Sequence, residues 1–149
     1  MTPTPRTRTQ ISDPTGRNVA ANVRRIREGR GWSTYELSRV LAEAGRPIAP
    51  SAVAKVERAE RRVDVGDLTA LAAALKVNPS ALLVPPTDGP ADTVELTGVG
   101  SVGGDRAWDW LDGEMPIEHI EPGDPGAALM FFQAYARPAG RRRSFFEGD

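Results

Sequence analysis

The 149-residue chain contains no cysteine and only one histidine, His119. Without thiols it can form neither disulfides nor cysteine zinc sites, and a single histidine rules out a histidine-rich metal site. No apolar run approaches the roughly 20 residues that a membrane-spanning helix needs. No apolar stretch follows the two arginines of the N-terminal MTPTPRTRTQ, so a secretory signal is not expected. We therefore expect a cytoplasmic protein without a metal site or membrane contact.

Patterns that would indicate catalysis are equally scarce. No nucleophile–base or metal constellation stands out, so the chain is expected to have neither enzymatic activity nor a cofactor. The nearest pattern is GVGSVG at residues 98–103, which satisfies the GxGxxG of dinucleotide-binding sites. Such a site needs a βαβ unit and an acidic residue about 20 positions further on, and no buried parallel strand is apparent after residue 103. A glycine turn after a short strand at 94–96 is the favoured interpretation.

Basic and acidic residues are divided unequally along the chain, although the net charge is only −1. Residues 17–86 carry 12 Lys/Arg against 7 Asp/Glu, whereas residues 87–149 carry 5 against 12. A positive excess confined to one half is typical of a domain that meets a polyanion. The acidic half would be repelled by the same partner.

Proline and glycine clusters divide the chain into segments. Residues 1–16 are rich in Thr and Pro and predict a flexible N-terminal arm. Residues 85–93, with three prolines and a glycine, predict a linker. Between them, residues 17–84 predict one helical domain. Beyond the linker we expect an acidic C-terminal region at 94–136 and a basic, disordered tail at 137–149.

Apolar periodicity and end signals predict five short helices in residues 17–84. The second begins with Ser33-Thr34-Tyr35-Glu36, in which Ser33 and Glu36 can form a capping box. The third begins near Pro50 and turns Val53 and Val56 inward. The other helices are expected at about 16–29, 64–75 and 78–83.

Five motifs follow one another in this segment: VRRIR at 23–27, GWS at 31–33, ELS at 36–38, VAKVER at 53–58 and LTALAAALKV at 68–77. In this order and spacing, residues 19–84 resemble the Cro/repressor-type (XRE) family of helix-turn-helix domains. The resemblance covers just under half of the chain. It implies a mainly α protein, with a five-helix repressor-like domain and a small acidic C-terminal appendage of short helices.

The resemblance also implies that the third helix, about 50–58, enters the major groove of DNA, which is about 12 Å wide and admits one α-helix. Base contacts are implied for this helix, a backbone contact for the start of the second helix, and a positive field for the surrounding arginines. The implied DNA-binding residues are Thr34, Arg39, Arg46, Pro50, Ser51, Ala54, Lys55, Arg58, Arg61 and Arg62. Arg27 and Glu57 match the family's buried arginine–glutamate pair, which ties the first helix to the third.

Two departures from the family pattern bear on recognition. Pro50 stands where many relatives have a hydrogen-bonding side chain, and the segment 41–49 is longer than the compact family turn by roughly one helical turn. Either the second helix extends, or residues 44–47 place Arg46 on a phosphate. We therefore expect modest base discrimination and a large electrostatic share of the affinity.

Two further helices are expected in the acidic region. DRAWDWL at 105–111 predicts a short helix, and its two tryptophans indicate either a small core or a contact surface. AALMFFQAYA at 127–136 predicts a last helix that is apolar on nearly every side except Gln133. Such a helix is expected to bury itself on the first domain, on the tryptophan helix or on a second copy of the chain. His119 is expected to be an ordinary loop residue.

These features predict a sequence-preferring regulator of transcription that binds double-stranded DNA, with a homodimer as one arrangement on symmetric half-sites. Two alternatives stay open. The chain could be an antitoxin-like autoregulator whose acidic C-terminal half binds a protein partner. It could also be an interaction module that has lost DNA binding.

Overall fold

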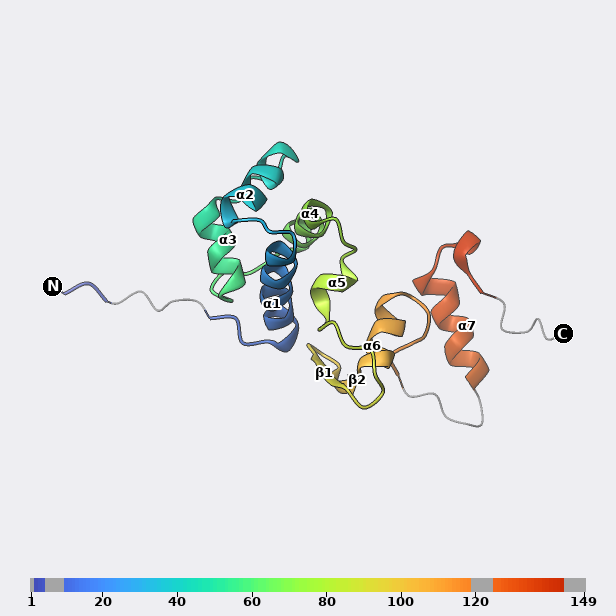
Figure 1. Ribbon diagram of the computed structural model, residues 1–149. Helices are drawn as coiled ribbons and strands as arrows, with labels where there is room; N and C mark the ends of the chain where they lie inside the picture. The colour runs from blue at the N-terminus through green and yellow to red at the C-terminus, as the bar shows by residue number, and fades with distance from the viewer. Residues whose placement is uncertain (1, 5–9, 119–124, 144–149) are drawn as a thin grey trace.

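The computed structural model describes residues 2–4, 10–118 and 125–143 and is mainly helical (Figure 1). Five helices come first: α1 (Pro14–Gly29), α2 (Thr34–Glu43), α3 (Pro50–Glu57), α4 (Val65–Leu75) and α5 (Ser80–Leu83). An antiparallel hairpin of β1 (Thr93–Leu96) and β2 (Gly100–Gly103) follows, then α6 (Gly104–Leu111), α7 (Pro125–Ala136) and a 3-10 turn, η1 (Ala139–Arg141). Within these residues no helix has the length and apolar character to cross a membrane.

Helices α1 to α5 enclose one hydrophobic core, as the five-helix prediction requires. Its largest fully buried side chains include Val23, Leu37, Leu41, Val53, Val56, Leu71, Leu75 and Leu82. The helix starts are fixed locally. Ser33 and Glu36 form the expected capping box at α2, and Asp64 forms a second one with Asp67 at α4. Side-chain oxygens thus accept from backbone N–H groups that have no partner within the helix.

Residues 10–13, which were expected to belong to the flexible arm, contact the helical domain. Ile11 is buried, and its N–H donates to the Ala59 carbonyl at 2.7 Å. Asp13 caps α1 by accepting from the Gly16 N–H at 2.9 Å, so the helix begins at Pro14. The buried Ile11 side chain, its backbone hydrogen bond and the Asp13 cap together hold residues 10–13 on the domain. No periodicity in so short a segment could indicate this.

A second, smaller hydrophobic cluster forms beyond α5. Val84, Val94, Leu96 and Ala107 are buried in it, and the tryptophans of α6 pack against them. The tryptophans therefore belong to a small core. The expected linker also takes part, because Trp108 Nε1 donates to the Pro85 carbonyl at 3.3 Å. At the other end of this segment, the Asp92 carbonyl accepts from the N–H of Gly104, the first residue of α6, at 2.7 Å.

The GxGxxG pattern forms the turn of the hairpin and its second strand. Gly98 and Gly100 have φ angles of +80° and +89°, which favour glycine. β1 pairs with β2 from Thr93 opposite Gly103 to Leu96 opposite Gly100. The glycines therefore close a tight connection between two strands, as the glycine-turn interpretation proposed.

Helix α1 fastens the second cluster to the first. The buried Asn22 side chain donates to the carbonyls of Leu82 and Val84, at 3.1 and 2.8 Å. One turn earlier, Asn18 donates to the Leu83 and Glu95 carbonyls at 3.1 and 3.2 Å. These amides satisfy the end of α5 and one backbone group of β1, so the hairpin lies against α1 (Figure 1).

Helix α7 lies at the end of the molecule opposite α1 to α5, beyond α6 (Figure 1). Its one polar side chain, Gln133, is buried, and its Oε1 accepts from the Arg143 N–H at 3.0 Å. Met130, Phe131 and Tyr135 are instead 62%, 65% and 79% exposed. The expected burial of this apolar helix is therefore incomplete within the single chain.

Replacing Asn22 by alanine tests the junction of the two clusters. The change leaves two carbonyls in a buried place without their donor, and we expect it to lower the free energy of unfolding by about 2–3 kcal/mol. Urea denaturation of the full chain measures this. The control is Asn78→Ala, since the Asn78 side chain is exposed and makes no hydrogen bond with another described residue. Equal stability of the two variants would contradict this role of Asn22.

A second prediction concerns acid stability. The hydrogen bonds from the Gly16 N–H and the Thr97 hydroxyl hold the pKa of Asp13 below its ordinary 3.8. A depressed carboxyl pKa stabilises the fold above the unfolded value, and this contribution is lost as the pH falls through the folded value. Asp13→Asn, which keeps a capping residue, should therefore flatten the fall in Tm between about pH 5 and pH 2.

The measurement is thermal unfolding of both chains across that pH range, followed by circular dichroism. Asp88→Asn is the control, because Asp88 is exposed and forms no ion pair with another described residue. An unchanged profile for Asp13→Asn would show that the cap and the Thr97 contact do not contribute.

Candidate nucleic-acid interface

The connection between α2 and α3 determines how α3 is presented. After α2 ends at Glu43, Gly45 has a φ of +82°, a left-handed conformation that suits glycine. Ile48 is buried, and its carbonyl accepts from Ser38 Oγ at 2.6 Å. Pro50 then takes the first turn of α3, where a missing N–H removes no helical bond. The extra residues form a loop and do not extend α2.

Helix α3 divides its side chains between the core and the surface. Val53 and Val56 are only 1% and 2% exposed and pack in the main core. Ser51 and Lys55 of α3 and Arg58, the residue directly after its end, are exposed, and their spacing of four and three residues aligns them along one side of the helix. We call these three residues the α3 stripe. A rigid helix with one buried and one exposed face can present the stripe as a unit.

The remaining candidate contacts flank this stripe. Pro50 and Ala54 are half-buried on α3, and Thr34 is half-buried as the first residue of α2. Tyr35, to which the sequence analysis gave no role, follows Thr34 and is 73% exposed. An exposed aromatic side chain at a helix start can reach sugar or phosphate. The only indication in the sequence that Tyr35 lies at a helix start was its place within the capping-box motif.

Arg27 and Glu57 join α1 to α3 by a two-pronged ion pair. Arg27 Nε and Nη2 donate to the two Glu57 carboxylate oxygens at 2.8 and 2.7 Å. The remaining Nη1 donates to the Trp32 carbonyl at 2.6 Å. The two side chains are 12% and 6% exposed, and the hydrogen bonds that Arg27 donates to the Glu57 carboxylate raise the pKa of its guanidinium. One side chain thus connects α1, α3 and the turn before α2.

Four of the five arginines expected to supply the positive field hold carboxylates. The ion pairs are Arg39 with Glu43 at 2.9 Å, Arg58 with Glu60 at 3.3 Å, Arg61 with Asp67 at 3.7 Å, and Arg46 with Asp64 at 2.9 Å and with Asp67 at 3.0 Å. Lys55 and Arg62 make no ion pair with another residue that the structure describes. The local field around α3 is therefore weaker than the number of basic residues indicates.

In this structure, which contains no DNA, the Arg46 side chain binds two carboxylates at the start of α4. Its Nε donates to Asp67 and its Nη2 to Asp64, which caps α4. The hydrogen bond to Asp67 raises the pKa of Arg46, and the Asp67 N–H lowers the pKa of Asp64. In the free protein, Arg46 therefore fastens the loop after α2 to the start of α4. Asp64 and Asp67 lie 18 and 21 positions after Arg46 in the chain, too far for a local sequence pattern to indicate either pairing.

A further basic surface lies on α1, to which no DNA contact was assigned from the sequence. Arg17, Arg24 and Arg25 are exposed and line a shallow depression together with Arg58 of the α3 stripe. The positive excess of residues 17–86 was the only signal for them. In the part of the chain that the structure describes, no group of three or more His, Asp or Glu residues could hold a metal ion.

Comparisons with known proteins found one matching family and similar solved structures. Residues 23–82 match the family described as "Helix-turn-helix". One similar solved structure is a hypothetical transcription factor, NHTF, from Neisseria, at 28% identity over 54% of this chain and 92% of that one, with a TM-score of 0.43. Another is the restriction-modification controller protein C.AhdI from Aeromonas hydrophila, at 27% identity over 45% and 94%, with a TM-score of 0.40. None of the curated proteins matches the chain.

The buried ion pair gives a direct stability prediction. Glu57→Ala leaves the Arg27 guanidinium enclosed without its carboxylate, and we expect a loss of about 3 kcal/mol or more in unfolding free energy. Chemical denaturation followed by circular dichroism measures the loss. Glu43→Ala is the matched control: it breaks a pair whose side chains are 63% and 66% exposed, and should cost under about 1 kcal/mol. A similar cost in both variants would refute the structural role of Glu57.

Proposed function

Because residues 23–82 form a helix-turn-helix domain of the Cro/repressor (XRE) type, we propose that this chain is a non-enzymatic, sequence-preferring regulator of transcription. In this proposal α3 enters the major groove of double-stranded DNA. The observation that carries it is the α3 stripe, an exposed row of polar side chains on a helix whose other face is locked into the core. A helix held in this way can keep its contacts in register with base edges.

Four residues in and beside the stripe have side chains that fit a DNA contact. Ser51 can donate to or accept from a base edge, and Lys55 can donate to guanine O6 or N7. Ala54 can touch a thymine methyl group, and Thr34 at the start of α2 can contact the sugar-phosphate backbone. Pro50 adds no donor. With so few polar groups on α3, base discrimination should be modest.

The electrostatic contribution follows from the ion pairs described above. Arg39, Arg46, Arg58 and Arg61 would have to share their guanidinium groups between carboxylate and phosphate. Lys55 and Arg62 face no such competition within the described structure. We therefore propose a positive field supplied by all six side chains, but with a shallower salt dependence than six unpaired cations would give.

One observation favours the second candidate function, a protein contact made by the C-terminal half. The apolar side chains of Met130, Phe131 and Tyr135 stand exposed on α7, and exposed apolar patches are common at protein interfaces. The contact could be with a partner protein, as in an antitoxin-like autoregulator, or with a second copy of the chain. Both are compatible with DNA binding by the first domain.

Selection of bound duplexes from a random DNA pool, at moderate salt and with the full chain, tests the proposed function. We expect one enriched sequence. Lys55→Ala should bind it about tenfold more weakly and accept more bases at one position, since a good base contact is worth ~1–3 kcal/mol. Ser51→Ala should relax a neighbouring position. A palindromic sequence would add support for a dimer.

The matched control removes the other lysine of the chain. Lys76 ends α4 with a φ of +63°, so Lys76→Asn removes the charge while keeping a residue that tolerates this conformation. Its selected sequence should equal that of the unaltered chain. Retention of DNA without enrichment, abolished uniformly by salt, would refute base recognition. No retention at all would favour the interaction-module alternative.

A further inference from the structure

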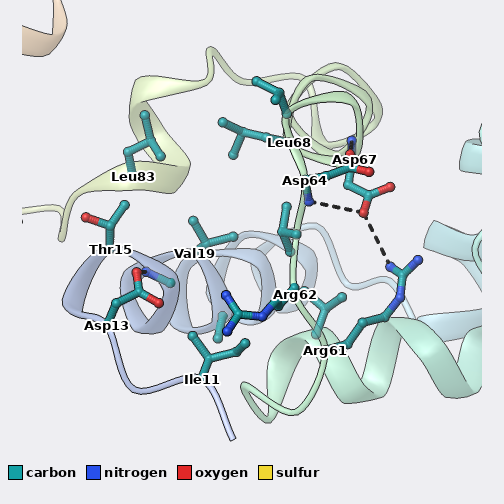
Figure 2. A pocket seen from close by; sticks show the side chains of 15 residues that line it. Ile11, Asp13, Thr15, Val19, Arg61, Arg62, Asp64, Asp67, Leu68 and Leu83 are labelled. Atoms are coloured by element: carbon teal, nitrogen blue, oxygen red, sulfur yellow. Dashed lines mark hydrogen bonds and ion pairs between the residues drawn. The ribbon is translucent and has the colours of Figure 1, made fainter. Parts of the chain in front are cut away.

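A pocket of about 600 Å³ opens beside the start of α1 and the start of α4 (Figure 2). The N-terminal segment at Ile11, the end of α3 and the loop at 61–65 close its other sides. Its volume falls in the range of small-molecule sites, about 300–1,000 Å³. Thr34 and the α3 stripe do not line this space, whereas Arg61 and Arg62, two of the residues proposed to supply the positive field, do.

The wall of the pocket is largely apolar. Val19 of α1, Val56 of α3, Leu68 of α4 and Leu83 of α5 line it, and Val19 and Val56 also belong to the main core. Figure 2 shows Val19, Leu68 and Leu83 converging on the space from three elements. Such a wall favours an apolar ligand body over a sugar or a free phosphate.

The carboxylates around the pocket are already engaged. Asp13 accepts from the Gly16 N–H and from Thr97 Oγ1, each at 2.9 Å. Asp64 accepts from the Asp67 N–H at 2.7 Å and holds Arg46. Asp67 holds Arg46 and accepts from the Asp64 N–H. A cation arriving in the pocket would therefore find no carboxylate without a donor.

Two arginines that line the pocket can supply charged donors. Among the described residues no hydrogen bond or ion pair holds the Arg62 guanidinium, and Figure 2 shows it pointing toward the space between Asp13 and Ile11. Arg61 Nη1 is buried without a hydrogen bond, and its nearest ion-pair partner, Asp67 Oδ2, is 3.7 Å away. Within the described residues, a buried donor without a hydrogen bond and an exposed, unpaired guanidinium beside an apolar wall favour a ligand that carries an acceptor, and preferably a negative charge.

From this arrangement we propose that the pocket binds small organic carboxylic acids, with the apolar body against Val19, Leu68 and Leu83 and the carboxylate on Arg62. A guanidinium matches a carboxylate with two parallel hydrogen bonds. Because Arg62 is exposed and Asp13 stands close by, the affinity should be weak, with a Kd of about 1 mM for a simple acid. Val56 connects the pocket to α3, so occupancy would also stabilise the end of that helix.

Titration of the ¹⁵N-labelled full chain with benzoate and with hexanoate, followed by amide chemical shifts, tests the proposal. Benzamide and hexanamide serve as neutral probes of the same shape. At least one acid should give saturable shifts centred on Val19, Val63 and Leu68, and its amide should bind about tenfold more weakly. The experiment contains no DNA, so its outcome is independent of the proposed regulatory function.

Two variants test whether Arg62 supplies the positive charge that binds the carboxylate of the ligand. Arg62→Gln should weaken binding of the acid about tenfold while leaving the fold intact, because replacing an exposed side chain costs little stability. Arg17→Gln removes an exposed arginine of α1 outside the pocket and should leave the affinity unchanged. The proposal fails if neither acid saturates by about 20 mM, if acid and amide bind equally, or if Arg62→Gln binds like the unaltered chain.

Discussion

The ion pair of Arg27 with Glu57 fixes the geometry on which the proposed DNA-binding surface depends. Three hydrogen bonds of 2.6–2.8 Å leave one guanidinium and reach α3 and the turn before α2. Removing a buried pair of charges from water costs several kcal/mol, which only well-aligned partners recover. The pair therefore tolerates little displacement, and the α3 stripe inherits that precision together with the packing of Val53 and Val56.

Charge in this domain is arranged more locally than its positive excess indicates. The two aspartates at the start of α4 cap the helix and also hold Arg46 and Arg61. A carboxylate near a helix N-terminus is favoured by the helix dipole as well. As a result the loops before and after α3 are held to α4. The same ion pairs weaken the positive field that a polyanion would meet. These carboxylates hold Arg46 and Arg61 but not Arg62, so the Arg62 guanidinium stays available to the pocket beside α1.

The C-terminal half is a continuation of the helical domain as far as α6. Asn18 and Asn22 on α1 satisfy carbonyls of the α5 end and of β1, and the two tryptophans complete the small cluster behind them. Helix α7 stands apart from this continuity. Its buried Gln133 and exposed Phe131 and Tyr135 invert the usual polarity of a surface helix, which is why a protein contact is proposed for it.

Interactions between near neighbours in the sequence determined the helical domain. Caps at α2 and α4, Pro50 at α3 and the apolar periodicity placed these three helices, and the periodicity turned Val53 and Val56 inward. Each of these signals acts within one or two helical turns. The pairing of Arg27 with Glu57 was accessible only through a resemblance, since 30 residues separate them. Tertiary structure alone decided that Arg46 donates to Asp67, that Asn22 donates to carbonyls at the end of α5 and that Thr97 donates to Asp13. These partners lie 21 to 84 positions apart, and a polar side chain carries no mark of its distant partner until packing brings the two together.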